Sequence, residues 1–84
     1  MARLWPEGMP VQAREGADGV PVAFYWLDGW HPVTLVAARW RVRLGWWTRE
    51  VAREYVKVTT SDGLLCTLFR DGSSGCWRLA RLYD

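Results

Sequence analysis

Apolar and polar side chains alternate along most of the 84 residues, with the period of two that is typical of strands in a half-buried sheet. Four Asp-Gly dipeptides interrupt these runs, and residues that tolerate positive φ suit tight hairpin turns. They are Asp18-Gly19, Asp28-Gly29, Asp62-Gly63 and Asp71-Gly72. The pattern predicts an all-β fold of about six antiparallel strands in meander order, forming a small, strongly bent sheet or a partly open barrel.

Pairing the strands through these turns places apolar side chains on one face, because a slip of one residue would send them all to the other face. A four-residue loop over residues 16–19 pairs Ala13 with Val22. A two-residue turn at Asp28-Gly29 pairs Phe24 with Val33. The same register continues the apolar face in both directions, so the expected core face runs from residue 9 to residue 37.

The apolar positions then change parity along the chain. Residues 33, 35 and 37 are apolar at odd positions, whereas residues 40, 42 and 44 are apolar at even positions. We therefore expect a bulge or sharp bend near Ala37-Ala38 that exchanges the two faces. Residues 45–53 lack a clean period of two, which predicts a loop or at most one short helical turn near residues 48–53, with Thr48 as its N-cap.

The length fits a single domain over residues 1–84, in which residues 1–8 are expected to form a less ordered N-terminal segment. A chain of this size buries only about 60 to 65% of the surface that its unfolded form exposes. Large side chains must therefore supply much of the core. Seven Trp, three Tyr and two Phe residues provide them, since each buried aromatic ring removes roughly 150–250 Å² from water.

Candidate catalytic and metal sites are absent from the pattern. Nucleophilic catalysis needs a nucleophile, a base and an orienting group, and the only histidine, His31, falls beside Trp26 on the expected core face. Two cysteines ten residues apart and one distant histidine do not make a zinc site. The sequence has no phosphate-binding glycine loop. We expect no enzymatic activity, no catalytic residues, no metal and no cofactor, with His31 packed in the fold.

Cys66 and Cys76 are expected to remain free thiols. Hairpin pairing across residues 71–75 places Cys66 several residue pairs away from Cys76, beyond the limit of about 7 Å between the Cα atoms of a disulfide. The sequence has neither an apolar run of membrane-spanning length nor a secretion signal. We therefore expect a cytoplasmic protein with no membrane partner.

The segment with the clearest excess of charge covers residues 39–57, which contain six basic and two acidic residues, whereas the whole chain has a net charge of +2. Aromatic residues are interleaved with these cations. Single-stranded DNA suits such a combination, because cations follow the phosphates while bases stack on rings. The candidate nucleic-acid or partner-binding residues are Arg39, Arg41, Arg43, Trp46, Trp47, Arg49 and Arg53.

A structural explanation of the same segment stays open. Trp40, Val42 and Leu44 would face the core, and the three odd arginines would form a solvated outer face paired with Glu50 and Glu54. Adjacent tryptophans cannot both point inward from one regular strand. One of Trp46 and Trp47 is therefore expected to be partly exposed in either case.

Several aromatic and turn positions together resemble a known family. They are Phe24-x-Trp26, Trp40-Arg41, Trp46-Trp47, Arg53-x-Tyr55, Asp62-Gly63 and the ending Gly75-x-Trp77-x-Leu79-x-Arg81-x-Tyr83-Asp84. From about Val11 to Asp84 the chain resembles a small bacterial domain family of unknown function, similar to the C-terminal extension of proteins related to Y-family, error-prone DNA polymerases. The resemblance implies a role in DNA repair or damage tolerance and brings no catalytic residues with it.

Two functions remain as hypotheses. One is a nucleic-acid-binding module that uses the arginines and an exposed indole. The other is an adaptor that binds a repair or replication protein through exposed Trp and Arg side chains, the residue types that dominate interface energetics. A strand edge near Pro32 or in the C-terminal strand would also allow self-pairing into a homodimer.

Overall fold

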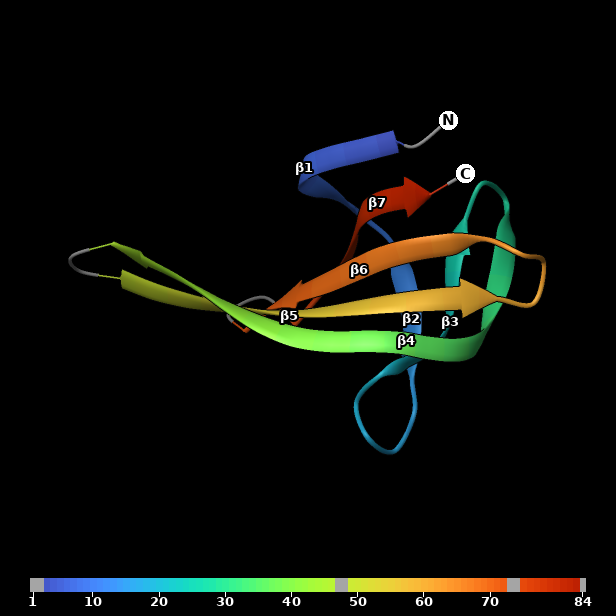
Figure 1. Ribbon diagram of the computed structural model, residues 1–84, viewed down its shortest axis with the longest axis horizontal. Coiled ribbons are helices and arrows are strands. Elements are labelled where there is room, and N and C mark those ends of the chain that lie inside the picture. Colours follow the sequence, from blue (N-terminus) through green and yellow to red (C-terminus); the bar gives the residue numbers. More distant parts are fainter. Residues whose placement is uncertain (1–2, 47–48, 73–74, 84) are drawn as a thin grey trace.

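The computed structural model of the chain (Figure 1) describes residues 3–46, 49–72 and 75–83. These residues form seven β-strands and no helix, so the prediction of an all-β fold is confirmed with one strand more than expected. The strands are β1 (Arg3–Pro10), β2 (Gln12–Glu15), β3 (Pro21–Trp26), β4 (Gly29–Trp46), β5 (Arg49–Thr60), β6 (Leu65–Asp71) and β7 (Trp77–Tyr83). The described segments include no helix of the length and apolarity needed to cross a lipid bilayer.

The seven strands pair antiparallel in the order β1-β7-β6-β5-β4-β3-β2. From β2 to β7 every strand pairs with its neighbour in the chain, as expected for a meander. β1 and β2 lie at opposite ends of this order although only Val11 separates them in sequence. The sheet therefore bends until its two ends meet at Val11, whose N–H donates to the carbonyl oxygen of Trp77 at 3.1 Å. No ladder joins β1 to β2 among the described residues, so the bent sheet stays open.

The N-terminal segment belongs to this sheet. Residues 3–8, for which we expected less order, lie in β1 and extend the sheet beyond β7. The ladder pairs Leu4 with Arg81 and Met9 with Leu79, and its register shifts between these pairs. Gly8 lies in this irregular stretch with a φ of 76°. Because β1 covers one side of β7 and β6 the other, the C-terminal strand is an inner strand and offers no edge for self-pairing.

The N-terminal hairpins pair two residues away from the predicted register. Phe24 lies opposite His31 rather than Val33, and on its other side opposite Ala13. The turn between β3 and β4 uses residues 27–28, both with positive φ (49° and 61°), one position earlier than expected. A shift of two residues leaves each side chain on its predicted face. Phe24 is therefore buried as expected although its partners differ.

Two bulges interrupt the ladder between β4 and β5. The expected one lies between Val36 and Ala38, and a second, which we did not predict, lies between Val33 and Leu35. Each bulge adds a residue to β4 and exchanges the faces on which its side chains lie. Two exchanges cancel, so Arg39 returns to the face of Val33, and the faces of the following residues are the reverse of those inferred from one bulge.

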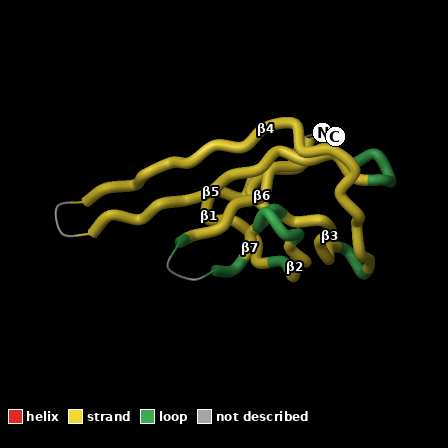
Figure 2. The backbone as a smooth tube through the Cα atoms, turned by 90° about the horizontal axis from the view of Figure 1, so that it is seen from below, coloured by secondary structure: helices red, strands yellow, loops and turns green. Residues whose placement is uncertain are grey.

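Beyond the body of the sheet, β4 and β5 continue as a two-stranded arm (Figures 1 and 2). Their pairing extends to Gly45 opposite Glu50 and Trp46 opposite Arg49. The predicted loop or helical turn is therefore wrong for residues 45–46 and 49–53, which lie in strands; Thr48 lies outside the described residues. A projecting ribbon buries little of either face, so its sequence is not constrained to alternate apolar and polar residues.

The core lies inside the bend of the sheet. Its buried side chains are Val20, Phe24, Trp26, Val56, Val58, Cys66, Leu68, Trp77, Leu79 and Leu82. Three residues of the expected core face are instead exposed: Val22, Leu35 and Ala37. Register shifts explain them, because Val22 is skipped where the pairing of β2 with β3 changes from Arg14 to Glu15, and the other two lie at the bulges of β4.

Candidate nucleic-acid interface

The ladder positions divide the side chains of β4 and β5 between two faces, because directly opposed residues share a face and neighbours along a strand do not. On the inner face Arg39 is opposite Val56, whose other partner is the buried Leu68. On the outer face Trp40 is opposite Tyr55. We call the row of Arg39, Arg41 and Arg43 the arginine row, and Trp40, Tyr55 and Phe69 the aromatic row.

The arginine row lies on the side of the sheet that carries the core, yet all three side chains are exposed. Among the described residues of β4 beyond Val33, none belongs to the core or packs against it, and the strand continues into the two-stranded arm (Figure 1). The alternative in which the arginines lie on the outer face while Trp40 packs in the core is therefore wrong. A hollow of about 340 Å³ lies here, bordered by Arg39, Arg41, Glu54 and Val56 among others.

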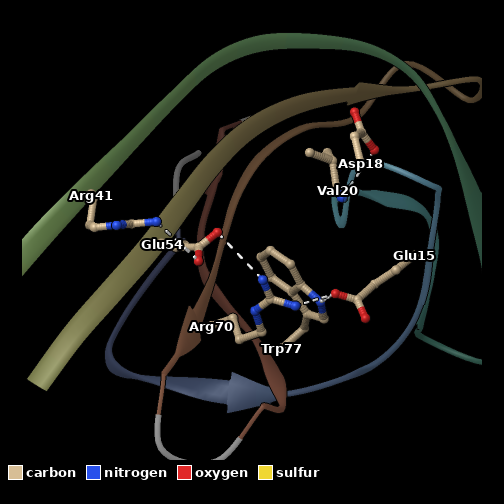
Figure 3. A network of polar contacts seen from close by, with 7 residues as sticks. All are labelled: Glu15, Asp18, Val20, Arg41, Glu54, Arg70 and Trp77. Carbon is tan, nitrogen blue, oxygen red and sulfur yellow. Dashed lines mark hydrogen bonds and ion pairs between the residues drawn. The ribbon is translucent and has the colours of Figure 1, made fainter.

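A network of ion pairs borders the arginine row (Figure 3). Glu54 lies 3.6 Å from Arg41 and 3.4 Å from Arg70, measured between carboxylate oxygen and guanidinium nitrogen. Arg70 also pairs with Glu15 and stacks over Trp77 at 5.0 Å from the ring centroid. Because the side chain of Arg41 is 62% exposed, its pair with Glu54 is solvated and weak. The charge of Arg41 is therefore only partly neutralised.

The predicted site residues do not form one surface. Arg39, Arg41 and Arg43 lie in line, but Arg53 faces outward, where its Nε donates to Asp71 at 2.9 Å. A hydrogen bond with Tyr55, followed by the charge of Asp71, raises the pKa of Arg53. Trp46 and Arg49 lie in strands, but their side chains are outside the described residues, as is the whole of Trp47.

The aromatic row is a feature that the sequence did not indicate to us. Trp40 and Tyr55 stack with their planes 4° apart and their centroids 5.3 Å apart, and Phe69 follows at 5.2 Å from Tyr55. Trp40 is 41% exposed, whereas Phe69 is buried at 1%. The sequence could have predicted that Tyr55 lies close to Phe69, because the two residues are opposite each other when the strands pair across the Asp62-Gly63 turn. The position of Trp40 depends on both bulges and was not accessible from the sequence.

Cations line the aromatic row on its open side. Lys57 lies 4.8 Å from the centroid of the Tyr83 ring, and Arg81 lies 5.3 Å from the same centroid. Neither forms an ion pair with a carboxylate in the described part of the chain. Hydrogen bonds with Thr67 and Arg81, together with the positive charges of Lys57 and Arg81, lower the pKa of the Tyr83 hydroxyl. The local potential here is therefore positive.

His31 lies away from these surfaces and links the turn after Trp26 to the turn at Asp62. Its Nδ1 lies 2.8 Å from a carboxylate oxygen of Asp62, and its Nε2 lies 2.9 Å from the carbonyl oxygen of Trp26. The hydroxyl of Thr60 donates to the other oxygen of Asp62. These contacts, that of Thr60 first, lower the pKa of Asp62. His31 is thus packed as predicted, and its contacts are structural.

The cysteines do not form a disulfide, as predicted. Cys66 is fully buried opposite Leu82, and burial raises its pKa to about 12. Cys76 is exposed immediately before β7. Within the described ranges, no three His, Cys, Asp or Glu side chains come together in a way that could hold a metal ion.

The side chains on the two faces of the sheet are suited to bind a ligand that carries both negative charge and planar groups. The arginine row supplies guanidinium groups, and the aromatic row supplies an accessible ring beside Lys57 and Arg81. Comparisons of the chain with protein-family models, with curated protein sequences and with solved structures found no match.

Proposed function

We propose that this chain is a nucleic-acid-binding module without enzymatic activity of its own. The observation that carries the proposal is the row of Arg39, Arg41 and Arg43, exposed and in line on a strand that projects from the body of the protein. Guanidinium groups bind phosphate through paired N–H donors, and a row of them follows a phosphate backbone. Single-stranded DNA is the form that we propose it binds.

The charge distribution supports this proposal more than the total charge does. Residues 39–57 carry six basic and two acidic side chains, so the remainder of the chain is slightly acidic given a net charge of +2. A polyanion is thus attracted to one part of the molecule. In the cell we propose a cytoplasmic role in DNA repair or damage tolerance, for which the resemblance of the aromatic and turn positions is the support.

A protein-binding adaptor is the second candidate, and the free edge of β4 favours it. From Val33 onward β4 pairs only with β5 in the described structure, and Leu35 is 60% exposed there. An unpaired edge can accept a strand from a partner or from a second copy. The two bulges disturb the backbone at this edge, as natural sheets do where edge pairing is avoided. For this reason we rank nucleic acid above a protein partner.

Fluorescence anisotropy with labelled single-stranded and duplex DNA tests the proposal. Wild-type protein should bind in a salt-dependent manner, because each phosphate contact adds about 0.7 to the salt slope for single strands and about 0.9 for duplexes. Arg39→Ser should lower affinity and reduce the slope by about one contact. Arg14→Ser is the matched control, since Arg14 is an exposed strand arginine that lies over Trp30, away from the arm.

Two results would contradict the proposal. One is no salt-dependent binding by the wild-type protein up to about 100 μM, the weak end of non-specific DNA binding. The other is equal loss of affinity in Arg39→Ser and Arg14→Ser, which would point to total charge rather than to the arginine row.

A further inference from the structure

A groove lies on the outer face of the sheet, lined by residues of β1, β4, β5, β6 and β7. Its volume is about 220 Å³, below the roughly 300–1,000 Å³ of pockets for drug-sized ligands. Trp5, Trp40, Tyr55 and Tyr83 line it, and the buried Phe69 is also in its lining. The size and the rings suit one planar group at a time.

A second row of side chains runs beside the aromatic row. The ladders place Lys57 opposite Thr67 and Thr67 opposite Arg81. These residues are two positions along the strands from Tyr55 and Phe69, which corresponds to a separation of about 7 Å. The aromatic row and the cations Lys57 and Arg81 are therefore adjacent. The distance between them is one that a single nucleotide spans from its base to its phosphate.

The polar groups in the groove are also suited to a base attached to an anion. Its lining contains Arg81, Thr67 and Tyr83, the hydroxyl groups of the last two lie 3.3 Å apart, and none of the described lining residues carries a carboxylate. Rings of this kind also stack on sugars or apolar peptide side chains. The unneutralised charges of Lys57 and Arg81 favour a ligand that carries phosphate.

From this geometry we infer that the groove holds an unpaired nucleobase stacked on the exposed ring of Trp40, beside Tyr55, with the adjoining phosphate on Lys57 and Arg81. The inference rests on the proposed nucleic-acid function and adds a preference for single strands. A duplex cannot use the groove, because its bases are stacked on one another and turn only their edges outward. The aromatic row then supplies the stacking that the function requires.

The decisive comparison uses three ligands of equal length, about 12 nucleotides: oligothymidine, an abasic strand with the same backbone, and a duplex. Trp40→Leu removes the exposed ring, and Trp40→Phe retains a smaller one. Trp30→Leu is the matched control, since Trp30 lies on the same strand, is exposed to the same 41% and also contacts an aromatic neighbour, Tyr25. Circular dichroism checks that each variant is folded.

Trp40→Leu should weaken oligothymidine binding roughly 5- to 150-fold, the range for loss of one stacked base, and leave abasic binding unchanged. Trp40→Phe should recover part of the loss, and Trp30→Leu should show none. Equal affinity of the wild-type protein for oligothymidine and the abasic strand would overturn the inference while leaving the proposed function intact. Unchanged oligothymidine binding in folded Trp40→Leu would do the same. Failure of the wild-type protein to bind any of the three ligands would overturn both.

Discussion

Gly8→Ala tests how β1 is held against the outer face of the sheet. Gly8 has a φ of 76°, in the left-handed region that side chains other than glycine rarely adopt. A Cβ atom at this position would lie 2.6 Å from Cε1 and Cζ of Phe69 and 2.7 Å from Cβ of Arg78. Phe69 is buried and cannot move aside without disturbing its neighbours. The substitution therefore combines a backbone penalty with a steric one.

The two penalties can be estimated separately. The left-handed conformation costs about 1–2 kcal/mol for alanine relative to glycine. Forcing an extra carbon into a packed site costs about 1–3 kcal/mol. Gly8→Ala should therefore reduce the free energy of unfolding by about 2–5 kcal/mol, out of roughly 4–13 kcal/mol expected for a chain of this size. The corresponding fall in Tm is roughly 8–40 °C.

Gly63→Ala isolates the steric contribution. Gly63 has a φ of 88°, so it carries the same kind of backbone penalty, but a Cβ there would meet no atom within 4 Å. Gly29→Ala provides the baseline, because that position has ordinary backbone geometry and open space. Urea titrations monitored by tryptophan fluorescence, with thermal melts by circular dichroism, measure all three variants.

The expected order of stability is Gly29→Ala, then Gly63→Ala, lower by about 1–2 kcal/mol, then Gly8→Ala, lower again by about 1–3 kcal/mol. Equal destabilisation by Gly8→Ala and Gly63→Ala would refute the close packing of β1 on Phe69. The groove assigned to a nucleobase would then lose one of its walls, since Trp5 is carried by β1.

Three further predictions concern reactivity, pH and affinity. A thiol reagent such as DTNB should label Cys76 rapidly at pH 8 and Cys66 only in denaturant, because Cys66 is buried with a pKa of about 12; fast labelling of two thiols in the native protein would contradict this. The lowered pKa of Asp62 stabilises the fold above the pKa of the unfolded chain, about 3.9, and this stabilisation is lost as the pH falls through the lower pKa of the folded protein. Asp62→Asn should therefore make the free energy of unfolding depend less on pH on the acid side, and identical pH profiles would contradict this linkage. Glu54→Gln removes the carboxylate that lies 3.6 Å from Arg41, a charge contact worth about 1 kcal/mol in water, so the variant should bind DNA up to about fivefold more tightly at low salt but not at high salt. Unchanged affinity at low salt would exclude Arg41 from the interface.

Local patterns predicted the elements that depend on neighbouring residues. The turn at Asp62-Gly63 forms where expected, with the N–H of Gly63 donating to the carbonyl oxygen of Thr60 and a positive φ at glycine. The parity change after Ala37 correctly indicated a bulge between Val36 and Ala38. Both follow from φ preferences and side-chain alternation, which act over a few residues.

Long-range register was not accessible in the same way. One undetected bulge between Val33 and Leu35 reversed the faces of Arg39 and Trp40, because a single added residue exchanges every side chain that follows it. The prediction of a loop or helical turn is wrong for residues 45–46 and 49–53, because a ribbon that projects from the body has no core to impose alternation. The error therefore fell on the segment that carries the candidate site.

The sequence by itself determined an all-β meander, the turn at Asp62-Gly63, the packed histidine and the separated cysteines, since each depends on local backbone preference or on counting along one hairpin. The tertiary structure decided which face of β4 carries cations and which carries rings. It also brought Trp40, Tyr55 and Phe69 into one row across three strands and placed Gly8 of β1 against Phe69. Which side chains share a row depends on the number of bulges in each strand and on how the whole sheet coils, and neither can be inferred from a local sequence pattern.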